Sequence, residues 1–182
     1  MSSSRRLILA TVAIVLLGCT IVVLMLSDRS ADRSFRQFAV DVDTAKVTSV
    51  TITWPGNDTT LTLNRKNDSW VVTVATGDMG AKEQNVGELL SCLSGVEAMR
   101  QMAKGEQSWA KYGVSDGCGT HVVVFGKSGS VADFYCGKVE IDQQRGRVLT
   151  YIRSSDESSV YMTDGYLNMI LNRPFSSWIM EY

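Results

Sequence analysis

His121 is the only histidine in the chain, so any chemistry that needs an imidazole has to be built around it. Ser-His-Asp and Cys-His catalysis both place that imidazole beside a nucleophile. Two apolar runs, Thr120 to Gly126 and Val131 to Gly137, flank the polar segment Lys127-Ser128-Gly129-Ser130. This pattern predicts a β-hairpin with His121 near its open end.

The hairpin determines which side chains surround His121. With Ser128-Gly129 as the loop, His121 faces Cys136, and Cys118 lies three residues before His121. Cysteine and histidine are zinc ligands, but a structural zinc site takes four of them, and the sequence offers no fourth at a helpful spacing. We therefore predict no metal site and treat Cys118 and Cys136 as a candidate disulfide. A three-ligand metal cluster and two separate thiols are the alternatives.

Other polar motifs give weaker signals of chemistry. The carboxylate pairs Asp41 with Asp43 and Asp156 with Glu157 are typical of solvated loops. The segment from Gly113 to Gly119 is glycine-rich, but it lacks the lysine and hydroxyl residue of a P-loop and the spaced glycines of a dinucleotide site. We expect no catalytic residue, no cofactor and no enzymatic activity.

The last residues of the chain concentrate aromatic and aliphatic side chains. Aromatic and methionine residues are enriched at protein interfaces, although such a tail can equally fold back to close its own core. We keep both interpretations, and the candidate partner-facing residues are Phe175, Trp178, Ile179, Met180 and Tyr182.

The charge balance argues against nucleic-acid binding. The 182 residues contain 18 Lys plus Arg and 19 Asp plus Glu, and no basic stripe is present. Nucleic-acid binding requires clustered cations that neutralise phosphates. We therefore expect no nucleic-acid partner.

The run Leu7 to Leu26 contains no charged residue and is long enough to cross a hydrocarbon core of roughly 30 Å as a helix. We predict a single transmembrane span. Leu16-Leu17-Gly18-Cys19 resembles a bacterial lipobox, so lipidation of Cys19 is an alternative, and a cleaved signal peptide is another. The predicted organisation is a leader and anchor over 1–27, a stalk over 28–43 and one extracytoplasmic domain over 44–182.

The orientation of the span in the membrane follows less clearly from the sequence than the span itself, because arginines lie on both sides of it. Long downstream domains are translocated largely regardless of such charges. We expect the N-terminus inside and the domain on the extracytoplasmic side of the bacterial cytoplasmic membrane.

The domain opens with three segments of strand periodicity, which predict an antiparallel meander. Across the turn at Pro55, Ile52 should face Leu61 and Val50 should face Leu63. Across a second turn, Leu63 should face Trp70. All of these apolar residues then share one face of the sheet.

The period becomes helical from Ala81 to about Arg100, where apolar residues recur three and four apart. A short helix ending at Gly113, the hairpin that carries His121, a second hairpin and a short helix before Pro174 follow. The predicted class is α+β: one N-terminal transmembrane helix, then a single domain of antiparallel meander and hairpins. It would contain about seven strands, one long amphipathic helix and a short C-terminal helix.

Several stretches between about Val40 and Asp164 share hydrophobic and turn patterns with a known family. They read DTAKVTSVTI, LTLNRKNDSWVV, VGELLSCLSGV, KYGV, THVVVFG, FYCG and TYIRSSDESSVYMT. In this order they resemble the uncharacterised bacterial family catalogued as domain of unknown function 4340. The resemblance implies an exported or membrane-anchored protein, often encoded beside ABC-type transporters, including those similar to gliding-motility transport components.

The leading functional hypothesis is a non-enzymatic accessory subunit of a membrane transport complex. It would bind an integral-membrane partner such as a transporter permease. The alternative is an extracytoplasmic ligand-binding or envelope-acting enzyme domain whose site the sequence does not reveal.

Overall fold

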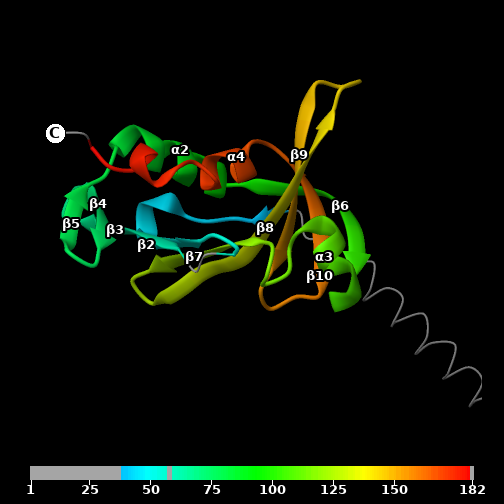
Figure 1. Ribbon diagram of the computed structural model, residues 1–182, viewed down its shortest axis with the longest axis horizontal. Helices are drawn as coiled ribbons and strands as arrows, with labels where there is room; N and C mark the ends of the chain where they lie inside the picture. The colour runs from blue at the N-terminus through cyan, green and yellow to red at the C-terminus, as the bar shows by residue number, and fades with distance from the viewer. Residues whose placement is uncertain (1–37, 57–58, 181–182) are drawn as a thin grey trace, which may run out of the picture. The chain divides into compact units, whose positions relative to one another are not determined.

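The fold is described from a computed structural model, which describes residues 38–56 and 59–180. In these residues ten strands form one sheet of order β1-β6-β10-β9-β8-β7-β2-β3-β4-β5, and all neighbouring strands are antiparallel (Figure 1). The strands are β1 (Phe38–Val40), β2 (Val47–Thr53), β3 (Thr60–Lys66), β4 (Ser69–Val74), β5 (Gly77–Gly80), β6 (Val96–Lys104), β7 (Thr120–Gly126), β8 (Gly129–Asp142), β9 (Arg147–Ser154) and β10 (Ser159–Asp164).

The helices of the described residues are few and short. They are α2 (Glu83–Leu93), α3 (Trp109–Tyr112), α4 (Leu167–Leu171) and the 3-10 turns η1 (Thr44–Lys46), η2 (Glu106–Ser108) and η3 (Phe175–Ser177). The fold is therefore mainly β, and the predicted α+β class with about seven strands is wrong. The predicted transmembrane run Leu7 to Leu26 lies outside the described residues, and no helix within 38–56 and 59–180 is both long and apolar enough to cross a membrane.

The predicted long amphipathic helix is also wrong, because only its first half is helical. Helix α2 ends at Leu93, and Gly95 precedes strand β6. Val96 pairs with Val40 of β1, while Ala98 pairs with Thr163 of β10. Pairing with strands from both ends of the domain thus overrides the helical spacing of the sequence.

The meander has the predicted inward face. Val50 pairs with Leu63 and Ile52 pairs with Leu61, as predicted. Trp70 lies opposite Arg65 instead of Leu63, because the second turn is tighter and has Asn67 at a positive φ of 55°. The shift is two residues, which leaves every side chain on its original face.

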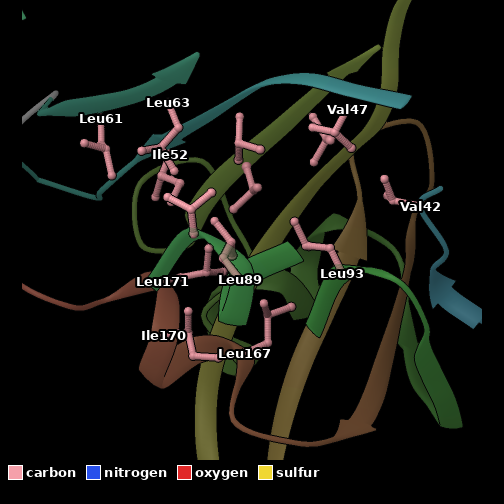
Figure 2. Packing of buried hydrophobic residues seen from close by; sticks show 14 of the residues in the cluster. Val42, Val47, Ile52, Leu61, Leu63, Leu89, Leu93, Leu167, Ile170 and Leu171 are labelled. Atoms are coloured by element: carbon pink, nitrogen blue, oxygen red, sulfur yellow. The ribbon is translucent and has the colours of Figure 1, made fainter. Parts of the chain in front are cut away.

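The main core lies between the sheet and one layer of helices (Figure 1). Figure 2 shows side chains from α2 and α4 pointing toward strands β2 and β3. The labelled members are Val42, Val47, Ile52, Leu61, Leu63, Leu89, Leu93, Leu167, Ile170 and Leu171. Val42 belongs to the range predicted as stalk, and it is only 4% exposed.

A smaller cluster holds η2 and α3 on the opposite face of the sheet. Tyr112 and Val114 pack there against Tyr151 and Val160. Gly113 ends α3 with a φ of 72°, a left-handed conformation that glycine adopts without strain. Beyond this cluster the outer face over β7, β2 and β3 is partly exposed.

Candidate functional site

His121 lies on the outer face of the sheet, opposite Tyr135 and not opposite Cys136. The loop consists of Lys127 and Ser128, since Gly126 pairs with Gly129, and a register shift follows at Phe125. This differs by one residue from the predicted register. Such a slip moves side chains to the other face, which is why Cys136 is buried while the His121 side chain is 32% exposed.

His121 forms a side-chain contact across the hairpin. Its Nε2 lies 2.8 Å from Oδ1 of Asp133. The hydroxyl of Ser155 donates to the same carboxylate oxygen. Because Ser155 bonds the carboxylate and not the imidazole, the three side chains do not form a nucleophile beside its base.

Four planar groups stack across the outer face, and we call them the ring ladder: His121, Tyr135, Arg153 and Trp109. The His121 and Tyr135 rings are 4.4 Å apart at 10°. The Arg153 guanidinium carbon lies 4.3 Å from the Tyr135 centroid and 3.7 Å from that of Trp109. Neighbouring strands β7, β8 and β9 place the first three in register. Both faces of the guanidinium therefore make cation–π contacts.

Arg153 also fixes the loop that precedes β7. Its Nε donates to the carbonyl of Val114 at 3.0 Å, and one terminal nitrogen lies 3.3 Å from Oδ1 of Asp116. The Arg153 side chain is 2% exposed, whereas Asp116 is 80% exposed. Burial, followed by the Asp116 carboxylate, raises the pKa of Tyr135. Arg153 thus fastens α3 and its following loop onto the sheet.

Sequence reasoning missed the ring ladder because its members come from three strands and a short helix. The sequence signal that could have pointed to it is the spacing of Tyr151 and Arg153, which puts an aromatic and a cationic side chain on the same face of one strand. It identifies a face, but it does not tell which residues of neighbouring strands lie alongside.

A second exposed surface is apolar, and we call it the arm patch: Val139, Ile141, Tyr166 and Met169. Their exposed fractions are 37%, 66%, 59% and 56%. The far half of the β8–β9 hairpin, which we call the arm, projects beyond the rest of the sheet (Figure 1). Large exposed apolar side chains that gather in one place are typical of interaction sites.

The backbone register puts Val139 and Ile141 on the side of the sheet that carries Thr150, next to the segment that leads into α4. Thr150 pairs with Val139, and its hydroxyl donates to the carbonyl of Gly165 at 3.2 Å, immediately before Tyr166. Ile141 follows Val139 by two residues and so points the same way. The Asn168 side chain donates to the carbonyl of Gly137, which ties α4 to the base of the arm.

The arm has polar ends that hold its shape. Asp142 accepts a hydrogen bond from the backbone of Arg145 at 3.1 Å and pairs with its guanidinium at 3.2 Å, which closes the tip. Arg147 lies 3.6 Å from Asp164, the last residue of β10. Charged groups thus border an apolar centre, the usual composition of a protein interface.

The C-terminal segment packs mostly onto the domain itself. Trp178 is completely buried, while Phe175 and Ile179 are partly buried against the main core. Met180 is 47% exposed, and Tyr182 lies outside the described residues. Backbone bonds from Lys82 to Trp178 and from Met180 to Gly80 align this segment beside β5.

The cysteines of the described residues are free thiols in different surroundings. Cys118 is exposed, with its sulfur 2.9 Å from the Ser115 hydroxyl, and Cys136 is buried. Burial raises the pKa of Cys136 from 9.0 to about 12. Cys19, the lipidation candidate, lies outside the described residues. Among the described residues no group of histidine, cysteine or carboxylate side chains has the arrangement of a metal site.

We expect iodoacetamide at pH 8 to modify Cys118 in the folded protein and to leave Cys136 unmodified. The Cys136 thiol is buried and uncharged at that pH, whereas the thiolate is the reactive form. Peptide mapping after alkylation measures this difference. In denaturant without reductant both should react, and protection of both would instead establish the predicted disulfide.

The same pKa shift should lower the stability of the folded domain at alkaline pH. The folded thiol is protonated up to about pH 12, while the unfolded thiol ionises near 9.0, so stability should fall as pH rises between these values. Urea unfolding of the unaltered protein and of Cys136→Ala at pH 8 and pH 11 measures this loss of stability. The variant should lose less stability over this interval.

Comparison with known protein families identifies a match. The model described as "Domain of unknown function (DUF4340)" matches residues 70–181, from β4 through the C-terminal segment. No curated protein and no solved structure matches the chain. The matched region includes the ring ladder and the arm patch.

Proposed function

The chain belongs to the DUF4340 family, a domain of unknown function, and from that premise we propose that its described domain is a protein-binding module. The observation that carries this proposal is the arm patch, where Val139, Ile141, Tyr166 and Met169 stand exposed together. Covering one large aliphatic side chain contributes roughly 1.5–3 kcal/mol. A partner that buries several of these side chains would therefore gain binding free energy from each.

The chemistry of the outer face favours binding over catalysis. Asp133 accepts hydrogen bonds from both Ser155 and His121, so the hydroxyl is not activated by the imidazole. We therefore propose a non-enzymatic role.

We further propose that the partner is an integral-membrane protein, such as the permease of an ABC-type transport complex, and that this chain is its accessory subunit. The support is the predicted span from Leu7 to Leu26. Phe38 follows Leu26 by twelve residues, which can extend over at most about 40 Å. A domain on so short a connection would meet partners close to the bilayer.

Replacing Ile141 with Asp should lower the amount of co-purified membrane partner at least tenfold. The substitution removes the most exposed aliphatic contact of the arm patch and introduces a charge into the covered surface. The measurement is quantitative mass spectrometry of the full chain, purified in detergent at native expression.

Val131→Asp is the matched control. Val131 is 51% exposed at the other end of β8, outside the arm patch. This variant should leave the amount of co-purified membrane partner unchanged. If both variants retain the partner equally, or if no membrane protein accompanies the unaltered chain, the proposal fails.

A further inference from the structure

The ring ladder ends at His121, and one face of its imidazole has no ring against it among the described residues. Tyr135 of β8 covers one face in a nearly parallel stack. The other face consequently points toward β2, the strand on the opposite side of β7. The His121 side chain as a whole is 32% exposed.

Strand β2 presents a small side chain where the next layer of the ladder would stand. Thr53 pairs directly with His121, and Thr60 of β3 pairs with Thr53. The two hydroxyls lie 3.1 Å apart and are exposed. Neighbouring strands are about 4.8 Å apart, close to the 4.4 Å between the His121 and Tyr135 rings, so the layer above Thr53 is where a further ring would continue the stack.

Polar groups border the imidazole of His121. The Nε2 of His121 is occupied by Asp133, while no described residue hydrogen-bonds its Nδ1. The Asp133 side chain is 43% exposed and can accept further hydrogen bonds. The site thus offers a ring face with hydroxyl, imidazole and carboxylate groups at its border.

We propose that this corner of the outer face, formed by His121, Thr53 and Thr60 and called the ladder end, binds a pyranose ring of a neutral polysaccharide. A pyranose has a flat C–H face that packs on an aromatic ring. Its hydroxyls donate and accept hydrogen bonds, which matches the threonine hydroxyls and the free Nδ1.

The local charges select a neutral ligand. Asp133 borders the ladder end, and Asp116 is exposed at the opposite end of the ring ladder. The guanidinium of Arg153 is 2% exposed and already paired, so it offers little to a phosphate or sulfate. Polyanions such as nucleic acids need exposed cations, and this surface supplies carboxylates instead.

The single histidine allows a direct test. The full chain, carrying a tag without histidine, is labelled with ¹³C-histidine, so that one imidazole signal reports on His121. It is titrated in detergent with chitohexaose, cellohexaose and maltohexaose, and with the hexanucleotide dT6 as an anionic probe. At least one neutral hexasaccharide should shift the signal in a saturable manner, and dT6 should not.

Two isosteric variants complete the test. Thr53→Val should weaken binding at least fivefold, because it removes a hydroxyl at the ladder end. Thr73→Val removes a hydroxyl on β4 that donates to Asp78 of β5, and it should change binding less than twofold. No shift with any neutral hexasaccharide, a shift with dT6 alone, or equal affinity of both variants would overturn the proposal.

This site is independent of the arm patch. Thr53→Val should leave the membrane partner in place, and Ile141→Asp should leave the saccharide shift unchanged. Failure of one proposal can thus be told apart from failure of the other.

Discussion

Replacing Leu93 with Asp should unfold the domain. Leu93 ends helix α2, is completely buried and packs in the main core between the helices and the sheet (Figure 2). Even Leu93→Ala should cost about 2–5 kcal/mol, through lost burial and the cavity left behind. The Asp variant adds an unpaired charge in that cavity, which is enough to exceed the whole stability of a typical domain.

Circular dichroism and urea unfolding of Leu93→Ala and Leu93→Asp measure this effect. Ser91→Asp is the matched control, because Ser91 lies on the same helix and is exposed. It should cost less than about 1 kcal/mol. A cooperative unfolding transition in Leu93→Asp, close to that of the unaltered protein, would contradict the described packing of α2.

Replacing Arg153 with Ala should destabilise the domain by about 3 kcal/mol. The change removes two cation–π contacts and leaves the Val114 carbonyl without its donor in a buried place. It also opens a cavity between Trp109 and Tyr135. The loop after α3 should become mobile first, because Arg153 bonds both Val114 and Asp116.

Urea unfolding gives the stability, and hydrogen exchange of residues 109–119 reports on the loop. Arg145→Ala is the control, since Arg145 is 69% exposed and pairs only at the arm tip. It should change stability by no more than about 0.5 kcal/mol. Equal stability of the two variants, with unchanged exchange, would show that Arg153 does not fasten this loop.

The meander could be predicted because its apolar pairs agree on one face. Pairing Val50 with Leu63 and Ile52 with Leu61 places all four on the buried face, whereas a slip of one residue would expose one strand's apolar side chains. In the hairpin around Ser128, the apolar residues do not select one register in this way. Glycines at 126 and 129 both permit a turn, and the register shift at Phe125 changes the face of His121.

Tertiary pairing explains the largest difference from prediction. The segment beginning at Val96 fits a helical period, yet its backbone finds strand partners at Val40 and Thr163, from opposite ends of the domain. Local periodicity contains no information about such partners. For the same reason, the sequence does not bring Trp109 and Arg153 together.

The arm patch was not predicted either, although its residues are apolar. Val139 and Ile141 lie beyond the predicted end of the strand at Gly137, in a stretch whose alternation is short. The sequence instead directed attention to Trp178, which the domain buries in its own core. Exposure depends on how far the arm extends past its neighbours, and that is a property of the assembled sheet.

Site-specific photocrosslinking tests the proposed partner surface most directly. A benzophenone amino acid is placed at Ile141, or at Val131 as the control, in the full chain at native expression. The account predicts a crosslink to an integral-membrane transport protein from position 141 and none from position 131. Crosslinking from both positions alike, or only to soluble proteins, would contradict it.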